Sequence, residues 1–414
     1  VNYMNPITNV RTFGSDPEKV LKNARAFTHI LQESGIAASC KHFPGDGVDY
    51  RDQHLHPSWN TLSAEEWFAS YGRIYEELIR DGLMSIMAGH IVQPNVIRAV
   101  DPSAGGEDML PGSQSRQMLT GVLRERYGFN GVIITDATIM GGYTMSMARS
   151  EAIPRTLAAG CDMFCFGTDI FEDITYLMEA VEDGRVSAER LDEAVTRVLA
   201  MKAALAAKEK ALQEEREQLG ENSALGRLAL TDAETEQKRC AEAAVTLVKN
   251  KGNIVPVSPE WYPRIRLAVL GSDDTFDGSL RQMAGDFLRG RGFEVEDYDP
   301  MEDDLHGTRV IPDDRLYLIL CNMPAASNQT TVRISWCPKH AMEIPRFVNE
   351  EASVFISFAN PYHLQDIPRV RTYINAYTAT RATVEAALGK LTGTGSFTGV
   401  SPVDPFCGLP DTRL

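Results

Sequence analysis

The sequence predicts an α/β fold in two parts, because short apolar runs alternate with amphipathic stretches along most of the chain. In residues 1–205 this alternation has the rhythm of βα units around a parallel sheet, and a second alternation begins at Glu242. A chain of 414 residues with 43% hydrophobic content is sufficient for two packed domains. We therefore expect a first domain over 1–205, a helical linker over 206–241 and a doubly wound α/β/α sandwich over 242–414.

The first part contains five short apolar runs, each of strand length and each separated from the next by a helical pattern. The runs predict strands at Val1–Met4, Ile36–Cys40, Leu83–Ala88, Gly131–Thr135 and Asp162–Phe166. The amphipathic stretches between and after them predict helices at Pro17–Ser34, Ala64–Asp81, Ser115–Tyr127, Ser150–Ala159 and Ile170–Asp183.

The middle of the chain is predicted to be a solvated helix. Ser187 has the residue type of a helix N-cap, and Lys202–Gly220 is rich in Ala, Lys, Glu and Gln with sparse apolar positions, which favours a linking helix over a coiled coil. In the second part we expect strands at Val245–Lys249, Arg266–Gly271, Phe293–Tyr298, Leu316–Leu320 and Val354–Phe358, and helices at Gly278–Arg291 and Thr383–Leu391. Gly290-Arg291-Gly292 follows a helix, so it is not a dinucleotide fingerprint.

Composition excludes several classes of protein. The net charge of -16 argues against a nucleic-acid-binding surface, which would be basic. No apolar run reaches the ~18–20 residues of a membrane helix. The seven cysteines include no C-x-x-C pair, and several lie in apolar runs, which indicates free thiols in a reducing compartment. We therefore expect a cytoplasmic protein with neither a nucleic-acid partner nor a membrane span.

Polar side chains follow each predicted strand of the first part. In parallel α/β folds the carboxyl ends of the strands meet at one rim, where binding and catalytic groups gather. Any one of these residues could be an ordinary loop residue, but the recurrence at one end favours a site. The set is Asn5 and Arg11 after the first run, Lys41 and His42 after the second, Gly89 and His90 after the third, Asp136 after the fourth, and Thr168 and Asp169 after the fifth.

The loop after Lys41-His42-Phe43-Pro44-Gly45 carries an Asp-x-His pair, Asp52 and His54. Imidazole has an ordinary pKa near ~6.5, so it can donate and accept protons near neutrality, and a neighbouring carboxylate orients it. The alternative is a loop histidine without a catalytic role. A metal site is a further alternative, because this loop holds three more candidate ligands. The helical H-E-x-x-H spacing is absent, so we expect no metal and no cofactor. Those further candidates are Asp46, Asp49 and His56.

Asp136 ends the apolar strand Gly131–Thr135 and precedes a turn with Gly141 and Gly142. A poorly solvated, rigidly aimed carboxylate suits a nucleophile that must approach one carbon atom. The alternative for Asp136 is an N-cap of the following helical turn.

Taken together, these segments resemble glycoside hydrolase family 3, in particular its β-N-acetylglucosaminidase branch. The segment from Asn5-Pro6 through Arg11-Thr12-Phe13-Gly14 to Asp16-Pro17 is similar to the family's N-P…R-[ST]-[FY]-G-x-D-P motif. Lys41–Gly45 followed by Asp52-Gln53-His54 is similar to the branch's K-H-F-P-G…D-x-H loop. Val245–Asn250 and Ser357–Tyr362 are similar to the family's sandwich domain.

The resemblance implies a (β/α)8 TIM-type barrel followed by the sandwich, acting on a carbohydrate substrate. Asp136 would be the nucleophile of a retaining exo-β-N-acetylglucosaminidase that hydrolyses terminal β-GlcNAc from glycans or cell-wall fragments. His54, paired with Asp52, would protonate the leaving oxygen and then activate the acceptor. The sugar-binding residues would be Arg11, Lys41, His42 and His90.

Alternatives remain. Because a histidine replaces the usual second carboxylate, phosphate could act as acceptor, which would make the enzyme a phosphorylase. A β-glucosidase of the same family is a further possibility. Five strands are fewer than the eight of a closed barrel, so we expect three more upstream of Val1. If none exist, a non-catalytic sugar-binding or structural relic is favoured. Ala137 also stands where the branch commonly has a second Asp.

Overall fold

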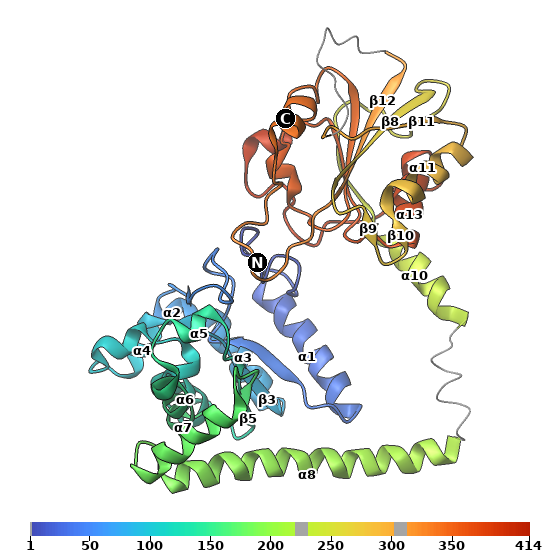
Figure 1. Cartoon of the computed structure of the whole chain (residues 1–414). Coiled ribbons are helices and arrows are strands. Elements are labelled where there is room, and N and C mark those ends of the chain that lie inside the picture. The colour runs from blue at the N-terminus through green and yellow to red at the C-terminus, as the bar shows by residue number, and fades with distance from the viewer. Residues whose placement is uncertain (1, 220–230, 302–312) are drawn as a thin grey trace. The chain divides into compact units, whose positions relative to one another are not determined.

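A computed structural model describes residues 2–219, 231–301 and 313–414 (Figure 1). The chain divides into two compact units. The first comprises Val1–Gly226 together with Ala326–Thr331, and the second comprises Arg227–Ala325 and Val332–Leu414. The segment Ala326–Thr331, which lies within the range 242–414 expected to form the second domain, belongs to the first unit.

The first unit is built on a four-stranded parallel sheet in the order β1-β3-β5-β6. Strands β2 and β4 form a separate two-stranded parallel sheet. The described residues of this unit form an open sheet of four strands, not a closed barrel. The strands are β1 (Ser39–Phe43), β2 (Ser58–Trp59), β3 (Ser85–Ala88), β4 (Ile91–Val92), β5 (Val132–Ala137) and β6 (Met163–Cys165).

The strand predicted at Val1–Met4 is wrong over its described part, since Asn2–Met4 is irregular and turn-like; Val1 lies outside the described residues. The reason is side-chain competition for the backbone. The Asn2 Oδ1 accepts a hydrogen bond from the Met4 N–H at 2.9 Å, and the Asn5 Oδ1 accepts from Ile7 and Thr8 N–H at 2.8 and 2.9 Å. Such asparagine turns satisfy the backbone locally and prevent strand pairing.

The helices of the first unit begin and end at the signals in the sequence. In α1, Pro17 occupies the first turn and the Asp16 carboxylate caps the Lys19 N–H at 2.9 Å. Ser63 and Glu66 form a capping box at α2. The helices are α1 (Pro17–Glu33), α2 (Ala64–Trp67), α3 (Arg73–Arg80), α4 (Pro94–Val100), α5 (Gly141–Thr144), α6 (Arg149–Ala159), α7 (Ile170–Glu182) and α8 (Ala188–Leu219), with π-helical segments at Phe68–Gly72 and Gln117–Arg126 and 3₁₀ turns at Gly105–Met109 and Gly112–Gln114.

The core of the first unit lies between its sheet and the helices that follow each strand. Phe43, Ile86 and Ile133 come from three adjacent strands and are fully buried with Trp67 and Leu119. Each such side chain contributes about 1.5–3 kcal/mol on burial. This packing fixes the strands, so the polar residues at their carboxyl ends are held on a rigid base.

The second unit is built on a six-stranded sheet in the order β11-β8-β12-β13-β14-β7, which is parallel except for the antiparallel edge strand β7. One apolar cluster joins the sheet to α11 and α13, and another covers the opposite face. The strands are β7 (Thr246–Asn250), β8 (Arg264–Gly271), β9 (Asp274–Thr275), β10 (Gly278–Ser279), β11 (Glu294–Asp297), β12 (Arg315–Asn322), β13 (Ala352–Ser357) and β14 (Thr372–Asn375). The helices are α10 (Thr231–Ala244), α11 (Leu280–Gly290), α12 (Pro338–Glu343) and α13 (Arg381–Leu391), with 3₁₀ turns at His363–Asp366 and Pro410–Arg413.

None of the helices described in these three ranges is both long and apolar enough to cross a lipid bilayer.

Candidate active site

The end of β1 places a buried histidine between two carboxylates. His42 Nε2 lies 3.4 Å from Asp136 Oδ2, and His42 Nδ1 lies 3.4 Å from Asp46 Oδ2. The peptide bonds Lys41–His42 and Phe43–Pro44 are both cis. Because parallel strands end at the same edge, β1 and β5 bring His42 and Asp136 together although they lie far apart in sequence.

Asp136 lies near the end of β5 and is mostly shielded, with a side chain that is 14% exposed. Its Oδ1 accepts a hydrogen bond from the Ala137 N–H at 2.8 Å, while its Oδ2 is the oxygen near His42. The two contacts fix the carboxylate plane. A carboxylate held in this way can approach a substrate carbon without first being ordered.

His54 and Asp52 form a tight pair. The His54 Nδ1–H donates to Asp52 Oδ1 at 2.7 Å, and the His54 backbone N–H donates to the same oxygen at 2.9 Å. The hydrogen bond that His54 donates to Asp52 raises the pKa of His54 above its ordinary value. Burial opposes this shift, the Asp136 charge adds to it, and the Arg11 charge opposes it. Burial alone would raise the pKa of Asp52, but its hydrogen bonds from His54 and Asn328 hold that pKa below the ordinary value.

His90 contacts Ala137, the residue that follows Asp136. Its Nε2 lies 3.1 Å from the Ala137 carbonyl, which can only accept, so Nε2 carries the proton and Nδ1 accepts from the Ser113 hydroxyl at 2.9 Å. Burial lowers the pKa of His90 to about 4, although the nearby Asp136 charge opposes the shift. His90 is therefore neutral near pH 7, and both ring nitrogens are engaged with protein groups.

Arg11, Lys41 and His42 share a cavity of about 510 Å³ beside α1. The Arg11 charge lowers the pKa of His54. Burial raises the pKa of Cys165, the Asp136 charge adds to this shift, and the Lys41 charge opposes it. Of the predicted site residues, Arg11, Lys41 and His42 line this cavity, whereas Asp52, His54, His90 and Asp136 do not. The binding roles of Arg11, Lys41, His42 and His90 remain predictions.

Sequence reasoning missed three supports of this site. Asp46 was considered only as a metal ligand, yet it faces His42 and accepts a hydrogen bond from Gln53 Nε2 at 2.9 Å. Gln53 Oε1 in turn accepts from the His90 N–H at 2.8 Å, so the middle residue of the Asp-x-His motif connects the two histidine loops. The N–H of Asn328 donates to Asp52 Oδ2 at 2.6 Å. The Gly-Asp-Gly sequence around Asp46 was the available signal; nothing marked Asn328.

The metal alternative gains no support from the described part of the chain, where no three His, Cys, Asp or Glu side chains gather in a way that could hold an ion.

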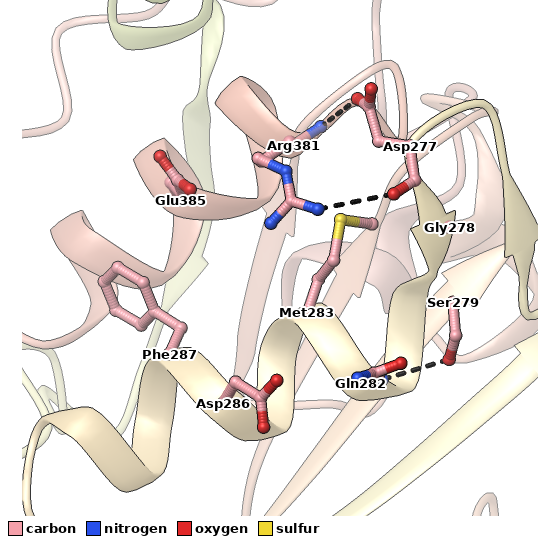
Figure 2. Close-up of a pocket in the computed structure, with 9 residues that line it drawn as sticks. All are labelled: Asp277, Gly278, Ser279, Gln282, Met283, Asp286, Phe287, Arg381 and Glu385. Atoms are coloured by element: carbon pink, nitrogen blue, oxygen red, sulfur yellow. Dashed lines mark hydrogen bonds between the residues drawn. The ribbon is translucent and has the colours of Figure 1, made fainter.

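A second, separate cleft of about 300 Å³ lies wholly in the second unit, between α11 and α13 (Figure 2). Asp277 accepts a hydrogen bond from the Arg381 N–H at 2.7 Å, and Ser279 Oγ accepts from the Gln282 N–H at 3.0 Å, so both polar side chains cap helices. None of the predicted site residues lines this cleft.

Strand ends that gather a shielded carboxylate and a carboxylate-oriented histidine can supply a nucleophile and a proton donor to one substrate. Residues 2–201 match the family model described as "Glycosyl hydrolase family 3 N terminal domain". The chain belongs to glycoside hydrolase family 3, as its sequence motifs predicted.

Named relatives and solved structures agree with this membership. The "Beta-N-acetylglucosaminidase/beta-glucosidase" of Cellulomonas fimi is 41% identical over 424 residues, covering 100% of this chain and 74% of the relative. A "Beta-hexosaminidase" of Tolumonas auensis is 37% identical over 154 residues, covering 37% of this chain and 43% of the relative. The solved structure "Beta-glucoside phosphorylase BglX" has a TM-score of 0.89 and 43% identity, covering 100% of this chain and 74% of that chain. A family 3 β-N-acetylglucosaminidase from Paenibacillus, at 22% identity and a TM-score of 0.71 over 98% of this chain and 74% of that one, shares the fold.

Proposed function

We propose that this protein is a retaining exo-β-N-acetylglucosaminidase that removes terminal β-GlcNAc from glycans or cell-wall fragments. The observation that carries the proposal is the Asp52–His54 pair, whose raised imidazole pKa responds to the Asp136 charge. The names of the Cellulomonas fimi and Tolumonas auensis relatives support an N-acetylhexosamine as the sugar that is released.

In the first step Asp136 attacks the anomeric carbon while His54 Nε2–H protonates the leaving oxygen. The glycosidic C–O bond breaks and a covalent glycosyl–Asp136 ester forms. Asp52 stabilises the imidazolium before the proton leaves, as a buried carboxylate does in other histidine-based sites. In the second step neutral His54 takes a proton from water, whose oxygen displaces Asp136 and restores the original anomeric configuration.

We propose that the four parallel strands of the first unit are part of a (β/α)8 barrel. Their parallel order and the clustering of site residues at their carboxyl ends support it.

Replacing Asp136 by Ala should abolish release of an aryl leaving group from an aryl β-GlcNAc substrate, because the covalent step then has no nucleophile. Glu125→Gln, an exposed carboxylate in the same unit, is the matched control and should retain wild-type turnover. The first sugar formed should be the β anomer in proton NMR. Near-normal turnover in Asp136→Ala, or an α product, contradicts the proposal.

A phosphorylase is the second candidate, since the similar structure BglX bears that name. With His54 in place of a second carboxylate, and with Arg11 within electrostatic reach of His54, a phosphate dianion meets less repulsion as acceptor. Running the reaction in buffer with and without inorganic phosphate separates the two. Formation of a sugar 1-phosphate in phosphorus NMR supports the phosphorylase, and free sugar alone supports the hydrolase. Aryl β-glucoside tested in parallel separates the β-glucosidase alternative.

A further inference from the structure

The Asp52 carboxylate receives a hydrogen bond from a segment 276 residues further along the chain. The Asn328 backbone N–H donates to Asp52 Oδ2 at 2.6 Å. Asn328 lies in Ala326–Thr331, the segment that follows β12 in sequence but belongs to the first compact unit. The Asp52 side chain is 0% exposed, so water does not compete freely for this oxygen.

The two oxygens of Asp52 are used unequally. Oδ1 accepts both hydrogen bonds from His54, whereas Oδ2 accepts the one from Asn328. A buried carboxylate oxygen that loses its donor is strongly destabilised, so the group would rotate or draw in water to replace it. Either response would change the direction in which Oδ1 holds the His54 ring.

The turn around Asn328 fixes where its N–H points. Asn328 has φ 63°, in the left-handed region that asparagine tolerates better than most residues. The Gln329 Oε1 accepts a hydrogen bond from the Ala326 N–H at 3.1 Å and closes the turn. The contact to Asp52 comes from the backbone, so it depends on the backbone conformation and not on the asparagine side chain.

We propose that Asn328 is a positioning residue for the acid/base pair. Its N–H holds Asp52, and Asp52 thereby sets both the orientation of His54 and its affinity for a proton. This inference rests on the proposed function of His54 as general acid. Asn328 acts through Asp52, and the proposal assigns it no contact with substrate.

Asn328→Pro tests the proposal, because proline has no N–H and its φ near −65° excludes the observed turn. Asn328→Gly keeps both the N–H and the left-handed φ and serves as the conservative variant. For Asn328→Pro we expect kcat/KM to fall about tenfold or more on a substrate with a poor leaving group, and by less than about twofold on a dinitrophenyl glycoside that needs no proton. Asn328→Gly should show a much smaller loss on both.

A double variant separates positioning from general damage to the turn. In an Asp52→Asn background the proline should change the rate less than about twofold further, because the two changes act through one contact. Equal losses on both leaving groups, or full additivity with Asp52→Asn, would overturn the proposal.

A measurement without turnover keeps this inference distinguishable from the proposed function. In a histidine NMR titration the His54 pKa should be lower in Asn328→Pro than in Asn328→Gly and the wild type, because a displaced Asp52 stabilises the imidazolium less. An unchanged His54 pKa overturns the positioning role. If the wild type shows no glycosidase or phosphorylase turnover, the proposed function fails while this titration still decides the positioning role.

Discussion

Gly141 lies where the helical turn after β5 approaches the loop that carries Asp52 and His54. Its N–H donates to the His54 carbonyl at 2.8 Å. A Cβ placed on Gly141 would lie 2.2 Å from the Leu55 carbonyl oxygen, whereas real Cβ atoms essentially never come closer than 3.0 Å. Gly141→Ala must therefore displace the loop backbone by about 0.8 Å. A displacement near 1 Å costs about 100-fold in rate, or about 2.7 kcal/mol of transition-state stabilisation.

The assay compares kcat/KM of Gly141→Ala and wild type on aryl β-GlcNAc substrates with good and poor leaving groups. Alanine is otherwise a favourable helix residue, and Gly141 does not have a positive φ, so the clash is the main effect. Gly106→Ala is the matched control, because a Cβ there meets nothing within 4 Å. We expect about a 100-fold loss on the poor leaving group, less on the good one, and none for Gly106→Ala. A folded Gly141→Ala protein within about twofold of wild type refutes the reasoning.

Three further predictions follow from the contacts of the first unit. Asp52→Asn should lower the pKa of His54, because the Asp52 carboxylate raises it. The proposed acid is active when protonated and loses its proton as the pH rises through this pKa, so the alkaline limb of the kcat/KM profile should move to lower pH. His90→Ala should reduce kcat and lower the free energy of unfolding in urea by about 1–3 kcal/mol, since it leaves the buried Ser113 hydroxyl without this partner and removes one of two donors to the Ala137 carbonyl. Asp162→Ala should lower that free energy by about 3–5 kcal/mol, because the fully buried carboxylate binds Arg124 and Arg190 at 2.5 and 2.6 Å; a change below about 1 kcal/mol would contradict this.

The alternation of apolar and amphipathic runs predicted most of the fold, because period and length carry that information locally. The run at Ile36–Cys40 predicted a strand that the structure places at Ser39–Phe43, since pairing with β3 and not hydrophobicity sets the register. Strand β14 was missed: Thr372–Asn375 is only four residues long, and its burial comes from its neighbours β13 and β7.

The site was predictable to the extent that its groups sit at strand ends. Parallel strands gather their carboxyl ends, so His42 and Asp136 could be expected to meet. The pairing of Asp52 with His54 could be expected from their spacing. The N–H of Asn328 could not, because a backbone donor has no residue-type signature and its partner is 276 residues away. The contact of Asp46 with His42 could not be predicted for a different reason. A carboxylate in a glycine-rich loop is equally typical of a metal ligand and of a solvent-exposed residue.

Three sets of hydrogen bonds hold the loop that carries Asp52 and His54. The Gly141 and Gly142 N–H groups bind the carbonyls of His54 and Gln53, and the Gln53 side chain binds the backbone of the His90 loop. The Asn328 N–H donates to Asp52 Oδ2, the carboxylate oxygen that His54 does not use. Protonation of the His54 imidazole strengthens its attraction to the Asp52 carboxylate. If the loop were mobile, this change in attraction would move the ring each time a proton was gained or lost. Because the backbone and the carboxylate are fixed independently, the ring direction can stay constant while a proton moves between substrate and ring, as both steps of the proposed double displacement require.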